Sequence, residues 1–324
     1  MRKVYLLAVS TAILASAFTA CTESEEITGA EQQKSLDFSV FANKNTRAAE
    51  TSTTLKTDGK KFGVWGYSTY NSGTPATVFN NQDVTYSLAD NAWNYSPLKF
   101  WDKSSSYVFY AYYPYDAANV EISAGMISIK NFTVAPTVAA HVDLMIANKI
   151  DRTAGSTANV QFNFNHILSN INLKFKKGAN LSIEDTKIIL NSVKLYGMDN
   201  GGSFVQTSAG TETGGTWTLS GNPTTASVGN LASNNEVTSS DFTIADILLI
   251  PQATTTLWLD ITYTLGDTNP QQFTRTLDIK DLATWGQNHK ITYNFTIDAD
   301  VITFDDPTVE DWDANSDVNG PDIE

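Results

Sequence analysis

The sequence predicts an all-β fold, and three observations support this prediction. The chain has 324 residues, 41% of them hydrophobic and 11% aromatic. Its Tyr, Phe, Trp, Thr, Val and Ile residues are separated by clusters of Asn, Gly, Ser and Asp, a composition typical of strands and turns. Apolar and polar residues alternate along many short segments, whereas beyond the N-terminus no apolar pattern of helical period exceeds about three turns. The length allows two domains of ordinary size.

Residues 1–20 predict export. They carry two positive charges, an apolar core and small residues before Cys21, as in a secretory signal peptide. Thr19-Ala20-Cys21 resembles a lipoprotein processing box, although Phe18 stands where Leu is usual. We therefore expect cleavage before Cys21, acylation of Cys21 (palmitate) and attachment to an outer-membrane lipid. An ordinary signal peptide with an incidental cysteine is the alternative.

Residues 21–47 are expected to form a lipidated propeptide that contains the first strand. Acidic residues directly after Cys21 form a solvated linker and resemble the surface-export signal of Bacteroidota lipoproteins. Leu36, Phe38 and Val40 alternate with polar residues, which predicts a half-buried strand ending at Phe41. Arg47 follows in a polar loop that a protease could reach, and an ordinary surface arginine is the alternative interpretation.

Residues 48–151 are expected to form the N-terminal globular part. Alternation and turn signals predict strands and a hairpin over Phe62–Tyr67, Val84–Tyr95, Tyr107–Pro114 and His141–Ala147. The run Tyr107–Pro114 is aromatic on both faces, so it should be a central strand, and Pro114 should end it.

Residues 152–304 are expected to form the C-terminal globular part, after a polar boundary at 152–158. Period-two alternation predicts its strands and hairpins, which are Val160–Phe164, His166–Phe175, Ile188–Tyr196, Gly197–Asn235, Leu257–Tyr263, Phe273–Ile279 and Ile291–Ile297.

Residues 305–324 are expected to be an acidic, disordered tail. Val301 to Phe304 and the segment up to Trp312 also have an extended pattern. Asn315–Gly320 matches the opening of a calcium loop, but the chain ends before the bidentate Glu that such a loop needs at its twelfth position. We therefore expect no metal here.

Composition also argues against several function classes. The net charge of −14 disfavours nucleic acid, which needs clustered Lys and Arg. Cys21 is the only cysteine, so an intrachain disulfide and a cysteine metal cluster are excluded. His141, His166 and His289 lack metal-ligand spacing, and neither a phosphate-binding loop nor a nucleophile elbow is visible. We expect no cofactor, no metal and no enzymatic activity.

An ordered set of short motifs resembles the fimbrillin-type (Mfa-like) pilin family of Bacteroidales. The motifs follow the lipoprotein start and comprise Phe100-Trp101, Phe109-Tyr110-Ala111-Tyr112-Tyr113-Pro114, Asp143-Leu144-Met145-Ile146-Ala147, Phe164-Asn165-His166-Ile167-Leu168-Ser169, Ile250-Pro251-Gln252, and Trp285 before Tyr293-Asn294-Phe295. This chain has Trp101-Asp102 where the family usually has Trp-Pro.

This resemblance implies a fold and an assembly mechanism. The expected fold is two tandem transthyretin-like β-sandwich domains. A protease is expected to cut between Arg47 and Ala48, which would release the strand of Leu36, Phe38 and Val40 from its groove.

A strand from another pilin subunit would then fill the groove. Our candidate for the donor strand contains Val301, Ile302, Phe304, Val309 and Trp312. The implied partners are other pilin subunits and an unidentified host or bacterial surface receptor.

Three functions are therefore compared. The favoured one is a structural subunit of a surface fimbria at the outer membrane, which supports adhesion, with a tip or anchor role as a variant. The second is an uncleaved surface lipoprotein that binds glycans through Trp217, Trp258 and Tyr196 near variable loops. An enzyme with a site assembled from distant residues is the third and least favoured.

Overall fold

Strands dominate the computed structural model of this chain, which confirms the predicted all-β class. The structure describes residues 33–42, 50–147, 149–179, 181, 187–207, 214–221, 227–228, 234–238, 240–298 and 301–312. Within these residues the helical elements are one turn of α-helix, α1 (Ser52–Leu55), and a 3₁₀ turn, η1 (Val138–Ala140). The predicted signal peptide, Cys21, Arg47, Ala48 and the chain beyond Trp312 lie outside them.

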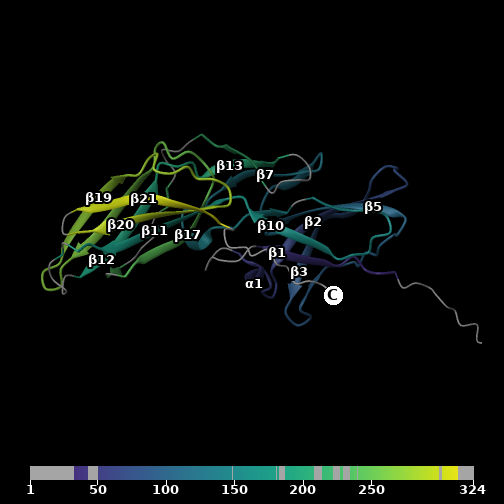
Figure 1. The fold of residues 1–324 in the computed structure, drawn as a ribbon, viewed down its shortest axis with the longest axis horizontal. Coiled ribbons are helices and arrows are strands. Elements are labelled where there is room, and N and C mark those ends of the chain that lie inside the picture. The colour runs from purple at the N-terminus through teal and green to yellow at the C-terminus, as the bar shows by residue number, and fades with distance from the viewer. Residues whose placement is uncertain are drawn as a thin grey trace, which may run out of the picture. The chain divides into compact units, whose positions relative to one another are not determined.

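The first sheet places the N-terminal strand at its edge (Figure 1). Its strands, in spatial order, are β1 (Phe38–Ala42), β10 (Val160–His166), β8 (Met145–Ala147), β5 (Ser105–Tyr113), β2 (Lys61–Tyr70), β3 (Ala76–Ser87) and β4 (Ala92–Asn94), and β9 (Ile150–Arg152) pairs with β5. The aromatic strand β5 lies centrally between β2 and β8, and it ends before Pro114 as predicted.

Two further sheets share one hydrophobic core and form a sandwich. One contains β17 (Phe242–Leu249), β11 (Ser169–Lys177), β20 (His289–Ile297) and β21 (Ile302–Asp311). The other contains β15 (Ser227–Val228), β12 (Ile188–Tyr196), β18 (Trp258–Leu265) and β19 (Gln271–Asp278), with β16 (Asn235–Val237) paired to β12. Inward side chains such as Leu173, Tyr293 and Ile261 are buried in one cluster, as alternation along each strand requires.

A fourth sheet joins strands that are far apart in the sequence. It contains β14 (Gly215–Leu219), β13 (Gly201–Gln206), β7 (Met126–Thr133) and β6 (Val120–Ser123), and β13 pairs with β7. Strand β10, which lies after the predicted boundary at 151/152, pairs with β1 and β8 in the first sheet. Strand pairing thus crosses that boundary, and the number and limits of the domains stay a prediction.

Two segments differ from their expected local structure. The strand expected over His141–Ala147 is confined to Met145–Ala147. The His141 ring bonds to the Ala135 carbonyl through Nε2 (3.1 Å) and accepts the Leu248 N–H at Nδ1 (3.0 Å), so this residue is held outside a ladder. Strand β21 continues through Pro307 to Asp311, beyond residue 305 where we expected the acidic tail to begin.

Candidate functional site: the groove of the first strand

Strand β1 and the residues just before it lie between β10 and the segment around Lys99. On one side it forms a parallel ladder with β10, in which Phe38 is opposite Val160 and Ala42 is opposite Phe164. On the other side the Leu36 N–H donates to the Lys99 carbonyl (2.9 Å). The segment that starts at Leu36 therefore has backbone hydrogen-bond partners on two sides, β10 on one side and Lys99 on the other.

Side chains from one face of this segment fill an apolar groove, as its alternation predicts. Leu36 and Ala42 are 0% exposed, Phe38 is 4% exposed and Val40 is 6% exposed. Phe41, on the opposite face, is 39% exposed. The four buried residues belong to the hydrophobic cluster of the first sheet, so this segment completes that core.

Phe38 is the centre of an aromatic cluster. Its ring is stacked on that of Phe162, with a centroid distance of 5.7 Å. It also meets four other rings at centroid distances from 5.4 to 6.3 Å, those of Phe62, Phe79, Tyr95 and Phe109. Tilted and edge-on pairs at such distances contribute beyond simple burial. This one side chain therefore contacts rings from β2, β3, β5 and β10.

The two ends of the segment are fixed by side-chain hydrogen bonds. The Tyr95 hydroxyl donates to the Leu36 carbonyl (2.7 Å) at the start. At the end, the Ala42 N–H donates to Ser52 Oγ (2.8 Å), and the Ser52 hydroxyl donates to the Ala42 carbonyl. Ser52 is the first residue of α1. Its hydrogen bonds to Ala42 therefore join the chain before residues 43–49 to the chain after them.

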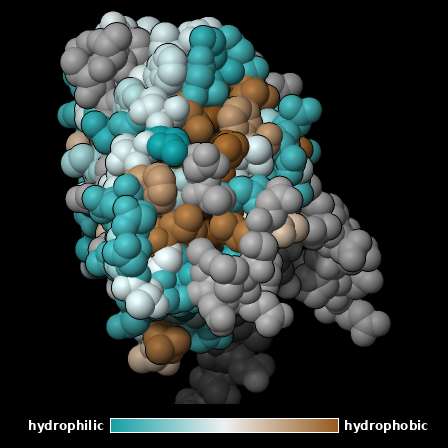
Figure 2. Space-filling model, turned by 90° about the vertical axis from the view of Figure 1, so that its left-hand side faces the viewer, coloured by the Kyte–Doolittle hydropathy of each residue, from teal (hydrophilic) through white to brown (hydrophobic). Residues whose placement is uncertain are grey.

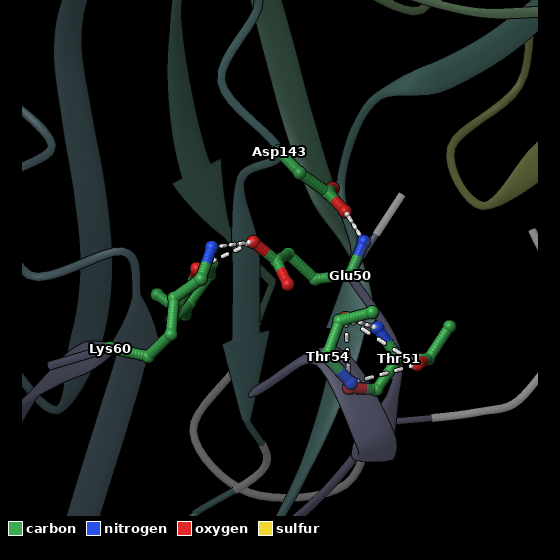
Figure 3. Close-up of polar contacts among 6 residues, drawn as sticks. Glu50, Thr51, Thr54, Lys60 and Asp143 are labelled. Carbon is green, nitrogen blue, oxygen red and sulfur yellow. Dashed lines mark hydrogen bonds and ion pairs between the residues drawn. The ribbon is translucent and has the colours of Figure 1, made fainter. Parts of the chain in front are cut away.

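The chain directly after residues 43–49 is anchored by Glu50 (Figure 3). The Glu50 N–H donates to Asp143 Oδ2 (2.8 Å). The Glu50 carboxylate accepts from Lys60 Nζ (2.5 Å) and from the Tyr113 hydroxyl (2.8 Å). The backbone of Glu50 is therefore bound to Asp143, and its side chain is bound to Lys60 and Tyr113.

The environment of Glu50 favours its charged form. Burial alone would raise the pKa of Glu50, but hydrogen bonds from Lys60, Thr54 and Tyr113 together hold the pKa of this carboxyl below its ordinary value. Burial and the neighbouring Glu50 charge raise the pKa of Tyr113, which therefore stays a protonated donor. A capping box between Thr51 and Thr54 then starts α1.

Asp143 also joins Glu50 to a buried histidine. Asp143 Oδ1 lies 2.8 Å from His166 Nδ1, and the two side chains are 5% and 2% exposed. Trp312 stacks on the His166 ring with a centroid distance of 3.9 Å and an interplanar angle of 6°. The indole covers the imidazole, so this histidine is closed off from a substrate.

Trp312 directly follows the C-terminal edge strand, β21. The Trp312 N–H donates to the Asn288 carbonyl (2.7 Å) just beyond β21, which pairs antiparallel with β20. Within and beside this strand only Ile302 and Trp312 are buried, at 8% and 5% exposure. Phe304 and Val309 are 38% and 50% exposed. Strand β21 is therefore held by few apolar contacts.

Exposed apolar side chains mark other parts of the described surface. The large ones are Phe41, Tyr70, Leu88, Leu98, Phe100, Val142, Val205, Val301, Phe304 and Val309. Figure 2 views the molecule from the side where β12 and β19 are labelled in Figure 1, and hydrophobic residues lie open there between hydrophilic ones. Contiguous apolar surface of this kind marks interaction sites when it is large.

The aromatic residues suggested for glycan binding have structural partners. Trp217 is half-buried, and its Nε1–H donates to the Ile167 carbonyl (2.8 Å) while its ring packs against Phe132 and Phe204. Lys280 lies over the Trp258 ring, with its Nζ 5.7 Å from the ring centroid. These contacts favour packing over an open sugar-binding platform.

The sequence and the structure agree on part of this site. Leu36, Phe38 and Val40 lie together in the groove, whereas Val301, Ile302, Phe304, Val309 and Trp312 lie on or beside one edge strand of another sheet. Sequence reasoning missed Glu50, Asp143 and their partners, because no spacing along the chain relates them.

In the described residues no helix is long and apolar enough to cross a membrane. The same residues contain no group of three or more His, Cys, Asp or Glu side chains placed to hold a metal ion.

The family model described as fimbrillin-like matches residues 46–312, and the chain therefore belongs to this family. A curated relative, the fimbrium subunit Fim1C of Phocaeicola vulgatus, is 27% identical over 191 residues. That match covers 51% of this chain and 49% of the relative, so it spans about half the length of each.

Two solved structures show the same fold. A fimbrial protein from Bacteroides vulgatus is 20% identical, with a TM-score of 0.53 over 86% of this chain and 99% of that chain. A candidate cell adhesion protein from Bacteroides ovatus is 18% identical, with a TM-score of 0.51 over 88% of this chain and 99% of that chain.

Proposed function

We propose that this chain is a structural subunit of a surface fimbria that supports adhesion. In this proposal it is exported as a lipoprotein acylated at Cys21 and presented at the outer membrane. A protease cuts between Arg47 and Ala48, and the subunit then assembles with other pilins by donor-strand exchange. Family membership supports the fimbrial role, and the relative named as a fimbrium subunit supports it further.

The observation that carries the assembly mechanism is the groove of β1. The covalent link between β1 and the rest of the chain runs through residues 43–49, which contain Arg47. Ala42 before this segment and Glu50 after it are each hydrogen-bonded to the N-terminal part. A cut at Arg47 would therefore leave β1 bound by non-covalent contacts alone, while the new N-terminus stays anchored through Glu50.

An empty groove would need a replacement strand. Departure of β1 would expose the rings around Phe38 and leave the ladder edge of β10 unpaired, and exposed edges bind other strands readily. Burial of each large apolar side chain contributes about 1.5–3 kcal/mol, so a strand with three or four anchors would form a long-lived joint.

Strand β21 is our candidate donor. It lies at a sheet edge, and its apolar residues Phe304 and Val309 are largely exposed. Its release would break the ladder with β20 and the contacts of Trp312, but it would uncover few other buried side chains. In another subunit's groove those residues would become buried, which favours the exchange.

The first test uses an Arg47→Ala precursor, with Lys44→Ala in the same segment as the matched control. Protein sheared from cells would be analysed by intact mass, N-terminal sequencing and electrophoresis with and without boiling. We expect Lys44→Ala to give an N-terminus at Ala48 and ladders that boiling disrupts, and Arg47→Ala to give neither. Normal polymerisation of the Arg47→Ala precursor would refute the mechanism.

A tip or anchor subunit is the second candidate, because β21 is interrupted. Its ladder with β20 shifts register between the pairs Thr292–Thr308 and Asn294–Asp305, so alternation is broken near Pro307. A strand with this irregularity could fail as a donor while the groove still accepts a strand. Subunits mixed in vitro after cleavage would distinguish the roles, because an accessory subunit would cap a fimbrial subunit without forming ladders with itself.

A further inference from the structure

A polar groove lies on the outer face of the sheet that contains β17, β11, β20 and β21. Its volume is about 910 Å³, which lies within the usual range for small-molecule sites, about 300–1,000 Å³. Asn172, Thr292 and Thr308, from the three strands β11, β20 and β21, contribute to its lining. This face points away from the apolar core, because its residues alternate with the buried Ile171, Leu173 and Phe175.

Two lining residues of this groove, Asn172 and Asp246, form a hydrogen-bond network with Asn170. Asn170 Nδ2 donates to Asp246 Oδ1 (2.7 Å), and the Asp246 N–H donates to Asn172 Oδ1 (3.1 Å). All three side chains belong to residues that are buried, with Asn170 at 0%, Asn172 at 3% and Asp246 at 6% exposure. Asn170 Oδ1 and Asn172 Nδ2 are buried without a hydrogen-bond partner among the described residues, so the network is only partly satisfied.

A β-bulge places Asp246 in this network. The register of β11 with β17 shifts between Ile171 and Leu173, and Asp246 has a φ of 59°. Few residues other than glycine adopt this left-handed conformation, although Asp does so more readily than most. Bulges redirect side chains next to functional sites, and here the bulge coincides with a lining residue of the groove.

One donor of this network is left without a partner. Asn172 lines the groove, and its Nδ2 is buried without a hydrogen-bond partner among the described residues. The amide orientation is fixed, because Oδ1 must accept the Asp246 N–H. A buried donor without a partner costs free energy unless a water or a ligand supplies an acceptor.

The lining selects the chemistry of the ligand. Two ammonium groups, Lys174 and Lys290, are balanced by two carboxylates, Asp246 and Glu310, and the remaining polar residues supply hydroxyls and amides. Such a lining offers donors and acceptors without net charge, which disfavours polyanions and apolar peptides. A neutral polyhydroxyl ligand presents both donors and acceptors on every ring.

We propose that this groove binds a neutral oligosaccharide, with Asn172 donating to a sugar hydroxyl. Aromatic rings are absent from the lining, so the sugar is held by hydrogen bonds alone and a Kd on the order of 1 mM is expected for one site. Thr308 and Glu310 of the lining belong to β21, so the groove is complete while β21 lies in its own sheet. This proposal deepens the adhesive role of the proposed function, but binding by a single uncut chain requires neither cleavage nor strand exchange.

The test uses the full-length protein and two groove variants. Neutral oligosaccharides of glucose, galactose, mannose and N-acetylglucosamine would be titrated to about 10 mM, with saturation-transfer NMR and the side-chain amide signals of Asn172 as readouts. Thr292→Val removes a hydroxyl and keeps the shape of the side chain. Asn172→Asp keeps the acceptor for the Asp246 N–H and removes the unpartnered donor. Thr296→Val is the matched control, because Thr296 lies on the same face of β20 but outside the groove lining.

We expect at least one oligosaccharide to shift the Asn172 amide signals, and Thr292→Val to weaken its binding roughly 10-fold. Asn172→Asp should weaken binding at least as much, while Thr296→Val leaves it unchanged. Circular dichroism checks that each variant is folded, and Thr292→Val decides the result if Asn172→Asp is not. The absence of binding by every oligosaccharide, or binding that Thr292→Val does not weaken, would overturn the proposal. Neither result bears on cleavage at Arg47, which the precursor experiment tests separately.

Discussion

Replacement of Phe38 by alanine is the sharpest test of the groove. Phe38 is 4% exposed and lies among five other rings, so its removal leaves a cavity rather than open surface. The surrounding rings are carried by hydrogen-bonded strands of the first sheet, which restricts collapse into the space. We therefore expect Phe38→Ala to weaken the docking of β1 far more than any change on the exposed face of the same strand.

The expected magnitude follows from the burial of this ring. Phe→Ala substitutions in cores cost about 3–5 kcal/mol, and the upper half of this range applies where the site cannot collapse. Lost ring contacts are part of that cost, since each aromatic pair contributes about 0.5–1.5 kcal/mol beyond burial. Every 1.4 kcal/mol is a factor of ten in an equilibrium constant, so about 4–5 kcal/mol should make local opening of β1 roughly 700–4,000-fold more frequent.

Native-state hydrogen exchange measures this opening directly, because protection of an amide reports the free energy of local unfolding. The variants would be made in an Arg47→Ala background to keep the strand covalently attached. The Leu36 amide, which bonds to the Lys99 carbonyl, is the reporter. Phe41→Ala is the matched control, because Phe41 has the same chemistry on the same strand but is 39% exposed.

We expect Phe41→Ala to change the exchange of the Leu36 amide by less than about tenfold. Equal acceleration by Phe38→Ala and Phe41→Ala would refute the view that one face of β1 holds the strand in its groove. Unchanged exchange in both variants would show that backbone hydrogen bonds alone control its release.

Three further predictions concern other parts of the molecule. Trp312→Ala should lower the free energy of unfolding by about 3–5 kcal/mol, because it removes a buried ring stacked on a buried imidazole. Urea titrations would measure this loss, and a loss below about 1 kcal/mol would contradict the stacking role. Because the folded pKa of Glu50 lies below its ordinary value of 4.5, its charged form stabilises the fold above about pH 4.5, and this contribution is lost as the pH falls through the folded pKa. Glu50→Gln should thus flatten the acid limb of stability against pH in urea titrations, and an unchanged limb would contradict it. Gly197→Ala should destabilise severely in thermal melts, since Gly197 has a φ of 86° and an added Cβ would overlap the Thr256 carbonyl oxygen. Gly221→Ala, with a φ of 79° but nothing within 4 Å, should cost only about 1 kcal/mol, and equal losses would refute the steric explanation.

Regular alternation made the strands of this chain predictable. The range expected for one strand, Ile188–Tyr196, is the range of β12, and the alternating segment around Ile291–Ile297 is β20. Each inward residue there has a buried position to fill, so sequence pattern and tertiary packing agree. The aromatic run of β5 was predicted as central because both of its faces are apolar.

Long-range pairing was beyond the reach of sequence patterns. Strand β7 carries an ordinary period-two pattern that does not specify a partner, yet it pairs with β13, about seventy residues later. Glu50 and Asp143 likewise carry no local signal, since the hydrogen bond between them joins residues 93 positions apart. Sequence reasoning therefore recognised the strand that fills the groove but missed the anchor that holds the chain after it.

The unequal burial of the two edge strands explains why processing would act on β1 in the proposed assembly. Strand β1 and its flank bury Leu36, Phe38, Val40 and Ala42, whereas β21 and its flank bury only Ile302 and Trp312. At about 1.5–3 kcal/mol for each large apolar side chain, β1 is held more strongly by side-chain burial than β21 is. On side-chain burial alone, β21 would open before β1. In the proposed assembly, cleavage after Arg47 would offset this difference, because β1 could then diffuse away once it opens, while Glu50 would keep the remaining chain in place. A groove that stays closed until cleavage would keep precursors from joining before they reach the cell surface.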